Sequence, residues 1–233
     1  MQRYFSYKKI DDFLYLNNDD LYHINTVMRM KNNDKVEIVY DKILYICELI
    51  DQRFKIVNKI DECKKNKPYI TIIIPYLKEQ KIDLILQKGT EMGVDEFIFC
   101  KMERSMVKID VKKLESKLPR WIKICKEASE QSKRVNIPII KNISNFKELN
   151  GIYGLNLTCS TQKNLKNIKN ALKSHKECDK INLVIGPEGG LATNEEKLLV
   201  DLGFELITLG DLIMRVETVP MYLTSVINYE YME

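Results

Sequence analysis

The chain has 233 residues, of which 45% are hydrophobic and 30% charged, a composition typical of a soluble globular protein with one large or two modest domains. No apolar run is as long as a membrane span, and the N-terminus lacks the apolar core of a signal peptide, so we expect no membrane association. The six cysteines are scattered without CxxC spacing and only two histidines occur, which indicates a reducing, cytoplasmic compartment and no metal site.

Residues 1–67 are predicted to form a small β-rich module. The stretch 35–60 reads KVEIVYDKILYICELIDQRFKIVNKI, with clustered β-formers and a turn expected at Asp41–Lys42. Helical spacing of apolar residues predicts a short helix within 20–30. A segment of this size suits a barrel, which would remove its open edges. The polar stretch 61–68, DECKKNKP, marks the expected domain boundary.

Residues 68–233 are predicted to alternate between strands and helices. Strands are expected at 69–77, 95–102, 137–140, 155–159, 181–186 and 205–210, and helices at 78–93, 117–133 and 216–232. Gly93 is expected to cap the helix at 78–93. The helix at 117–133 should have Pro119 in its first turn and Leu118, Trp121, Ile122 and Cys125 facing inward. This alternation predicts an α/β domain with a mostly parallel sheet and helices on both faces.

Three of these strands are followed by unusual loops, at 158–162, 186–190 and 210–218. In parallel α/β sheets, ligands bind at the carboxyl ends of strands. The second loop, Gly186 to Gly190, reads GPEGG, and its glycines would let the backbone approach a ligand closely. It is neither a dinucleotide fingerprint nor a P-loop, and a glycine turn without a ligand is the alternative. Thr193 and Glu196 are expected to form a capping box for the next helix.

The third loop, LGDLIMRVET, also has two readings. As a binding element, it would offer Leu209, Gly210, Ile213 and Met214 as a pocket wall, with Arg215 directed at an anion. As a structural element, it would place Arg215 and Glu217 on the surface at a helix start. Two such loops at successive strand ends favour a ligand pocket.

Positive charge is concentrated in residues 101–141, which hold twelve Lys or Arg against five Asp or Glu, an excess of +7. Such an excess predicts a phosphate-binding surface, and a solvated helix face is the alternative. Within it, ERSMVK contributes Arg104 and Ser105, and EQSKR contributes Lys133 and Arg134, residue types that bind phosphate when they are not simply caps or turns.

Together these segments resemble blocks of the RsmE family, SPOUT-class methyltransferases of ribosomal RNA. The resembling segments, in chain order, are MQRYF, YHINTVMRMKNND, KIDLILQKGTEMGV, ERSMVK, RWIKICKEASEQSKR, IGPEGGL and LGDLIMRVET. The resemblance implies a PUA-like RNA-binding β-barrel at 1–67 and a SPOUT domain with a deep trefoil knot at 68–233. It also implies a homodimer that methylates N3 of a uridine in 16S ribosomal RNA of the small subunit, with S-adenosylmethionine as donor and S-adenosylhomocysteine as product.

The resemblance also implies roles for individual residues. Arg215 and Glu217 would lie closest to the reacting centre. Cofactor-binding residues would be Leu157, Thr158, Ile185, Gly186, Pro187, Glu188, Gly189, Gly190, Leu209, Gly210, Ile213, Met214 and Thr218. RNA-binding residues would be Arg3, Arg29, Lys31, Arg104, Ser105, Lys133 and Arg134. The chain departs from the family in having Ser160 where a glutamate is common, and Val216 and Val219 where small or polar residues often stand.

Three competing functions differ in class. A SPOUT enzyme acting on transfer RNA would share the fold and the cofactor. A non-catalytic RNA-binding protein for ribosome assembly would retain only a vestigial pocket. An enzyme acting on nucleotide phosphates would need a lysine or a metal-binding carboxylate cluster beside the glycine loop, and the sequence offers neither.

Overall fold

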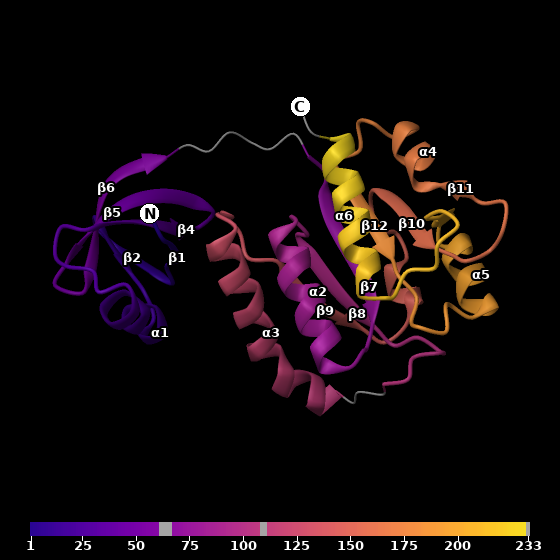
Figure 1. The fold of residues 1–233 in the computed structure, drawn as a ribbon, viewed down its shortest axis with the longest axis horizontal. Coiled ribbons are helices and arrows are strands. Elements are labelled where there is room, and N and C mark those ends of the chain that lie inside the picture. Colours follow the sequence, from indigo (N-terminus) through magenta and orange to yellow (C-terminus); the bar gives the residue numbers. More distant parts are fainter. Residues whose placement is uncertain (61–66, 108–110, 232–233) are drawn as a thin grey trace. The chain divides into compact units, whose positions relative to one another are not determined.

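The computed structural model describes residues 1–60, 67–107 and 111–231. Their contacts divide the chain into two compact units, the first containing residues 1–60 and 126–137 and the second 67–125 and 138–231. Figure 1 labels the elements of both units. Residues 61–66 of the expected boundary lie outside the described residues.

The first unit is a six-stranded mixed sheet in the order β1-β4-β5-β6-β3-β2. Its strands are β1 (Arg3–Phe5), β2 (Lys8–Ile10), β3 (Phe13–Tyr15), β4 (Lys35–Tyr40), β5 (Ile43–Ile50) and β6 (Arg53–Ile60). The turn between β4 and β5 has positive φ at both Asp41 (49°) and Lys42 (60°), which confirms the predicted hairpin. The helix expected within 20–30 is instead α1 (Asn18–Tyr22) followed by the π-helical turn η1 (His23–Val27).

Residues 126–137 join the first unit through ion pairs. Lys126 Nζ lies 2.6 Å from Asp20 Oδ1 and 2.7 Å from Glu130 Oε1. Glu37 accepts from Arg3 Nε at 2.9 Å and pairs with Lys133 Nζ at 3.1 Å. The apolar core of the unit includes Leu14, Ile38 and Phe54, all fully buried. Sequence periodicity cannot detect this attachment, because the partners are about a hundred residues apart.

The second unit is built on a seven-stranded sheet in the order β11-β13-β10-β12-β7-β8-β9. Its strands are β7 (Tyr69–Pro75), β8 (Glu96–Cys100), β9 (Ile139–Ile143), β10 (Leu155–Cys159), β11 (Lys166–Asn167), β12 (Lys180–Val184) and β13 (Glu205–Thr208). Every pairing in it is parallel, so the predicted parallel α/β sheet is confirmed. β7 is buried over most of its length, as its run of isoleucines indicated.

Helices cover both faces of this sheet, as predicted (Figure 1). The helices are α2 (Glu79–Glu91), α3 (Val111–Gln131), α4 (Ile168–Lys173), α5 (Thr193–Asp201) and α6 (Thr218–Glu230), with the 3-10 turn η2 (Phe146–Leu149). On one face, a Cβ at Gly89 of α2 would lie 2.8 Å from the Phe97 ring, and Trp121 of α3 stacks on Phe99 at 4.4 Å. On the other, Leu199 of α5 and Phe146 of η2 pack in one core cluster with Ile73.

Three local predictions were wrong. α3 begins at Val111 rather than near 117, so Pro119 lies inside the helix, where the ring removes one backbone donor. Ile122 is 44% exposed instead of inward. The cap of α5 is Ala192 rather than Thr193, and Glu195 Oε2, not Glu196, accepts from the Ala192 amide at 2.9 Å.

The predicted glycine end of α2 is confirmed, because Gly93 follows the last residues of the helix with φ +98°.

None of the helices in the described residues combines the length and apolarity that crossing a bilayer requires. Across the same residues, histidine, cysteine and carboxylate side chains form no group of three or more that could hold a metal ion.

Candidate functional site

Three loops meet at one edge of the sheet of the second unit. β10 lies between β12 and β13, and Thr158 of β10 is aligned with both Val184 of β12 and Leu206 of β13. Because all three strands are parallel, the loops that follow them leave at the same edge. The structure therefore brings together the segments 158–162, 186–190 and 210–218, which the sequence had singled out separately. We call this arrangement the three-loop edge.

The loop after β12 is a tight turn made of backbone. The Gly190 amide donates to the Pro187 carbonyl at 2.8 Å, and Gly190 has φ +70°. A Cβ at Gly186 would lie 3.0 Å from the Leu191 nitrogen and 3.2 Å from the Gly190 carbonyl carbon, both backbone atoms. Glycine is therefore needed at Gly186 for close approach and at Gly190 for its dihedral angle. A Cβ at Gly190 would meet no heavy atom within 4 Å, so this side of the turn is open.

The loop after β13 exposes large apolar side chains. Leu212 is 83% exposed and Ile213 is 87% exposed, while Met214 is half-buried. Gly210 has φ +111° and open space where its Cβ would be. The loop ends where the Thr218 amide donates to the Arg215 carbonyl at 2.8 Å, and α6 begins. The residues predicted to form a pocket wall lie in this loop, but Ile213 faces solvent in the single chain, and their contact with a ligand stays a prediction.

The end of β10 carries a buried hydroxyl without a partner. Thr158 is 0% exposed, and its Oγ1 makes no hydrogen bond among the described residues. An unpaired buried hydroxyl is costly, and such groups in native proteins call for an explanation. Leu157 and Ile185, also predicted to line the site, are buried in the strand ends beside it. Beyond the strand, Gln162 Nε2 donates to Glu196 Oε2 of α5 at 2.5 Å.

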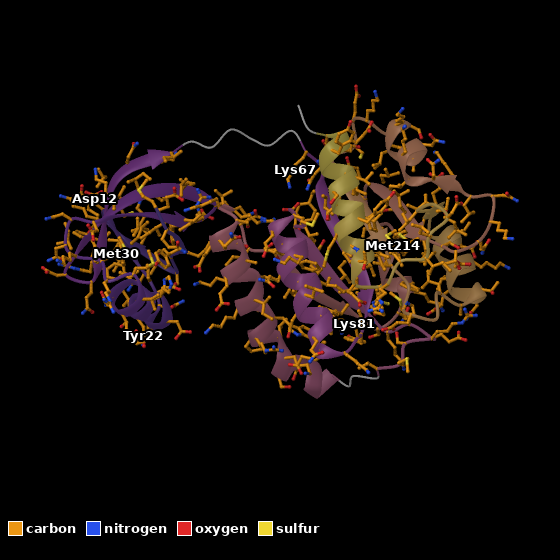
Figure 2. The ribbon with its side chains drawn as sticks, in the orientation of Figure 1. Asp12, Tyr22, Met30, Lys67, Lys81 and Met214 are labelled. Carbon is orange, nitrogen blue, oxygen red and sulfur yellow. The ribbon has the colours of Figure 1, made fainter. Side chains whose placement is uncertain are left out.

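A lysine that sequence reasoning had not placed in the site links two of the loops. Lys81, labelled in Figure 2, is in the first turn of α2. Its Nζ lies 2.8 Å from Glu188 Oε1 and 3.1 Å from Glu217 Oε2. The side chains of Lys81, Glu188 and Glu217 are 28%, 38% and 15% exposed. Glu188 belongs to the glycine-rich turn and Glu217 is the N-cap of α6. Lys81 is the first residue of the segment KIDLILQKGTEMGV, but a lysine near a helix start does not indicate these remote partners.

The charges of this cluster are stabilised mutually. Burial alone would raise the pKa of Glu217, but a backbone hydrogen bond and the Lys81 and Arg215 charges outweigh burial, so the pKa lies below its ordinary value. The pKa of Glu188 is also below its ordinary value: burial opposes ionisation, but the hydrogen bond from Lys81, a backbone hydrogen bond and nearby lysine charges together outweigh burial. The carboxylates of Glu188 and then Glu217 beside its ammonium raise the pKa of Lys81. The three groups are therefore all ionised at neutral pH.

Arg104 contacts the glycine-rich turn. Its Nη1 donates to the carbonyls of Gly189 and Leu191, each at 3.1 Å. The neighbouring Glu103 amide donates to Glu195 Oε1 at 2.8 Å. The segment after β8, which sequence reasoning assigned to RNA, therefore also supports the candidate cofactor turn. Ser105 beside it is half-buried.

The other residues predicted to bind RNA lie in the first unit and differ in exposure. Arg29 and Lys31 are exposed, and Arg29 has φ +52°. Arg3 and Arg134 are buried, at 4% and 7% exposure. Arg3 and Lys133 are engaged with the Glu37 carboxylate. For all of them, contact with RNA stays a prediction.

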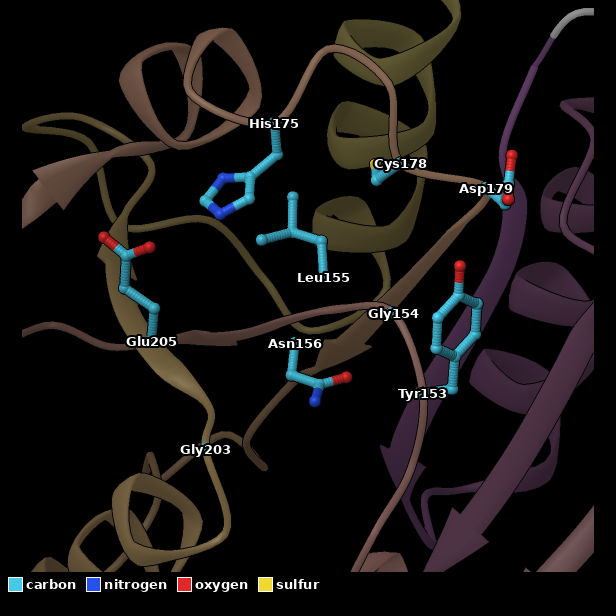
Figure 3. Close-up of a pocket in the computed structure, with 9 residues that line it drawn as sticks. All are labelled: Tyr153, Gly154, Leu155, Asn156, His175, Cys178, Asp179, Gly203 and Glu205. Atoms are coloured by element: carbon cyan, nitrogen blue, oxygen red, sulfur yellow. The ribbon is translucent and has the colours of Figure 1, made fainter.

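A cavity of about 400 Å³ lies at the opposite edge of the sheet, not at the three-loop edge. Its lining residues are Tyr153, Gly154, Leu155, Asn156, His175, Cys178, Asp179, Gly203 and Glu205 (Figure 3). Leu155 and Glu205 are the first residues of β10 and β13, so the cavity opens at the amino ends of the strands. We favour the three-loop edge as the functional site because ligands of parallel α/β sheets bind at the carboxyl ends.

Comparison with known proteins agrees with this architecture. Residues 64–228 match the family described as RNA methyltransferase domain, and residues 16–58 match the RNA methyltransferase PUA domain. A ribosomal RNA small subunit methyltransferase E of Bacillus subtilis is 32% identical, covering 99% of this chain and 97% of its own. The enzyme of the same name from Mesomycoplasma hyopneumoniae is 31% identical, covering 97% and 98%.

Solved structures show the same fold over the full length. A crystal structure described only as a hypothetical protein superposes with a TM-score of 0.86 at 29% identity, covering 99% of both chains. A ribosomal RNA small subunit methyltransferase E from Neisseria gonorrhoeae, bound to S-adenosyl methionine, has a TM-score of 0.86 at 24% identity and covers 98% of this chain and 97% of its own.

A PUA domain joined to a methyltransferase domain, both matched in order along this fold, defines the chain as an RNA methyltransferase. The relatives that match it over nearly all of both lengths narrow the class further. The chain belongs to the ribosomal RNA small subunit methyltransferase E family, which confirms the resemblance seen in its motifs.

Proposed function

We propose that the protein transfers a methyl group from S-adenosylmethionine to N3 of a uridine in 16S ribosomal RNA. The observation that carries the proposal is the three-loop edge, where backbone turns after β10, β12 and β13 adjoin one another. Family membership supports the substrate class, since the named relatives are ribosomal RNA small subunit methyltransferases.

The residues of the three-loop edge fit this cofactor. The Thr158 hydroxyl lacks a partner within the described residues, so a bound ligand would satisfy it. The turns at Gly190 and Gly210 leave open space beside their backbones, where amide and carbonyl groups can read a nucleoside. When bound, S-adenosylmethionine would supply an electrophilic methyl group and leave as S-adenosylhomocysteine. Leu157, Thr158, Ile185, Gly186, Gly190, Leu209 and Met214 would hold it, largely through backbone.

Arg215 and Glu217 would act on the uracil. N3 becomes nucleophilic only when its imide proton leaves, so the site must favour the anionic base. The exposed Arg215 guanidinium would stabilise negative charge developing on a uracil oxygen. Glu217 would orient Arg215 rather than accept the proton, because a carboxylate with a lowered pKa is a weak base. The target base would have to leave its stack to reach these groups.

The remaining inferences concern assembly. We infer a homodimer, because Leu212 and Ile213 expose apolar surface beside the site that a second subunit would cover. We propose a cytoplasmic location separately, because the named relatives are ribosomal RNA methyltransferases. A trefoil knot formed by the segment after β13 belongs to the same proposal. The first unit, with Arg29 and Lys31, would contact the RNA backbone.

The proposal is tested by incubating the purified protein with methyl-labelled S-adenosylmethionine and either small ribosomal subunits or transfer RNA. We expect labelled 3-methyluridine, identified by mass spectrometry of nucleosides, in 16S RNA alone. Label confined to transfer RNA, or carried on a ribose, would show a different methyltransferase. Absence of methyl transfer to either RNA, together with no calorimetric binding of S-adenosylmethionine, would favour a non-catalytic assembly protein.

A further inference from the structure

Lys81, at the start of α2, forms ion pairs unlike those usually found on a protein surface. Its ammonium lies between two carboxylates that belong to two different loops of the candidate site, 107 and 136 residues away along the chain. The Lys81 amide donates a hydrogen bond to the Lys78 carbonyl at 2.9 Å in the first turn of α2. Farther along α2, Ile82, Ile85 and Leu86 are buried against the sheet. Lys81 is therefore fixed by a rigid element, whereas both of its partners are on loops.

We propose that Lys81 is a positioning residue for methyl transfer: its ammonium ties the glycine-rich turn, through Glu188, to the start of α6, through Glu217. This inference rests on the proposed function of the three-loop edge. A lysine suits the task because its compact ammonium has three donors and can serve two carboxylates at once. Lys81 itself would touch neither the base nor the cofactor. It would act through Glu217, which adjoins the Arg215 loop.

The contribution of these ion pairs to global stability is small. All three side chains are partly exposed, and ion pairs of this kind contribute little to the free energy of unfolding. Their effect is on geometry, because the chemistry at a site depends on groups held within a fraction of an ångström. Removing Lys81 should therefore loosen the two loops without unfolding the protein.

The Lys81 ammonium also affects the ionisation of both carboxylates. Lys81 and Arg215 both favour the ionised form of Glu217, and Lys81 with Lys78 favours that of Glu188. Without the Lys81 ammonium, burial would dominate more, and the pKa of Glu217 would rise. If ionised Glu217 orients Arg215, the acid limb of the activity profile would then move to higher pH.

Lys81→Met is the test, and Lys117→Met is its matched control. Lys117 is also a lysine that tethers α2, with its Nζ 3.0 Å from Glu79 Oε2 and a side chain 31% exposed, but its partner is on α2 and on neither loop. The first measurement is hydrogen exchange of the ligand-free protein at residues 186–190 and 209–218. We expect exchange at least several-fold faster at both loops in Lys81→Met, and wild-type rates in Lys117→Met.

The second measurement is the pH profile of kcat on small ribosomal subunits. We expect Lys81→Met to lower kcat more than it changes KM for the cofactor, and to shift the acid limb upward. Lys81→Arg, which restores the charge, should return the limb toward the wild-type position. A purely structural lysine would produce no such charge-dependent shift.

Wild-type exchange at both loops in a folded Lys81→Met variant would overturn the proposal. If Lys81→Met does not fold, Glu217→Gln removes the Lys81–Glu217 ion pair from its other end while Lys81–Glu188 remains. Wild-type exchange at residues 209–218 in that variant would overturn the proposal equally. Loss of the proposed function is a separate outcome. An inactive wild-type protein would refute uridine methylation, while the exchange experiment would still decide the role of Lys81.

Discussion

Replacing Gly186 with alanine tests whether the glycine-rich turn binds the cofactor. The new Cβ would lie 3.0 Å from the Leu191 nitrogen, so reaching an ordinary contact of 3.4 Å requires the turn to open by about 0.4 Å. Overpacking of this kind costs about 1–3 kcal/mol, and the stiffer unfolded chain offsets about 0.4–1 kcal/mol of it. We expect a net cost of about 1–2 kcal/mol, located in the turn.

The assay is calorimetry with S-adenosylmethionine. If the glycine-rich turn must be closed to bind S-adenosylmethionine, the same cost raises the Kd for the cofactor about 5- to 30-fold. Gly203→Ala is the matched control. Gly203 has φ +85° and no neighbours within 4 Å, so alanine there costs about 1–2 kcal/mol of backbone strain without a clash. It lines the cavity at the opposite edge of the sheet.

The two variants should therefore lose similar stability, while only Gly186→Ala loses cofactor affinity. The reverse result, with affinity lost in Gly203→Ala and kept in Gly186→Ala, would place the cofactor in the cavity of Figure 3 and refute the reasoning.

Three further predictions address other parts of the structure. Arg215→Ala should lower kcat about 100- to 1,000-fold, because it removes a group that stabilises developing charge. Calorimetry should find the affinity for S-adenosylmethionine within about two-fold of wild type. An equal loss of kcat and of affinity would show that Arg215 holds the cofactor instead. Thr158→Val should raise the Kd for S-adenosylmethionine by about ten-fold, the value of one hydrogen bond. Urea unfolding should find the protein no less stable, because the buried hydroxyl has no partner among the described residues. Unchanged affinity would count against a ligand contact at Thr158. Burial raises the pKa of Glu130 from 4.5 to about 7, so its ionisation costs stability as pH rises between those values. Glu130→Gln, which stays neutral, should therefore be more stable than wild type at pH 8, by at most about 3 kcal/mol, with the difference shrinking toward pH 4.5; urea unfolding that gives the same difference at both pH values would contradict this.

The elements predictable from sequence were those with a strong local pattern. β7 and β12 are dominated by apolar residues, and such stretches in an alternating chain indicate buried parallel strands. The hairpin turn at Asp41–Lys42 and the end of α2 at Gly93 were predictable because each needs a residue that tolerates positive φ. Parallel topology then made the convergence of the three loops predictable, since strand ends share an edge.

The errors arose where a tertiary contact decides the outcome. A glutamate follows both Ala192 and Thr193 at the capping-box spacing. The capping residue is Glu195, whose Oε2 accepts from the Ala192 amide and whose Oε1 accepts from the remote Glu103 amide. The prediction took Pro119 as a first-turn residue, whereas α3 begins at Val111 and holds Pro119 in its interior.

Lys81 and Arg104 were missed or given another role for the same reason. Their partners, Glu188 with Glu217 and the Gly189 carbonyl, lie more than eighty residues away in sequence. A single sequence records the residue type but not the distance, so ion pairs that assemble a site from remote loops cannot be read from spacing.

Mass spectrometry of 16S ribosomal RNA from cells that lack this protein tests the central claim most directly. A 3-methyluridine should disappear on deletion, return with a wild-type copy, and stay absent with an Arg215→Ala copy that is expressed equally. Persistence of every 3-methyluridine after deletion, or full recovery with Arg215→Ala, would contradict the assignment of uridine methylation to the three-loop edge.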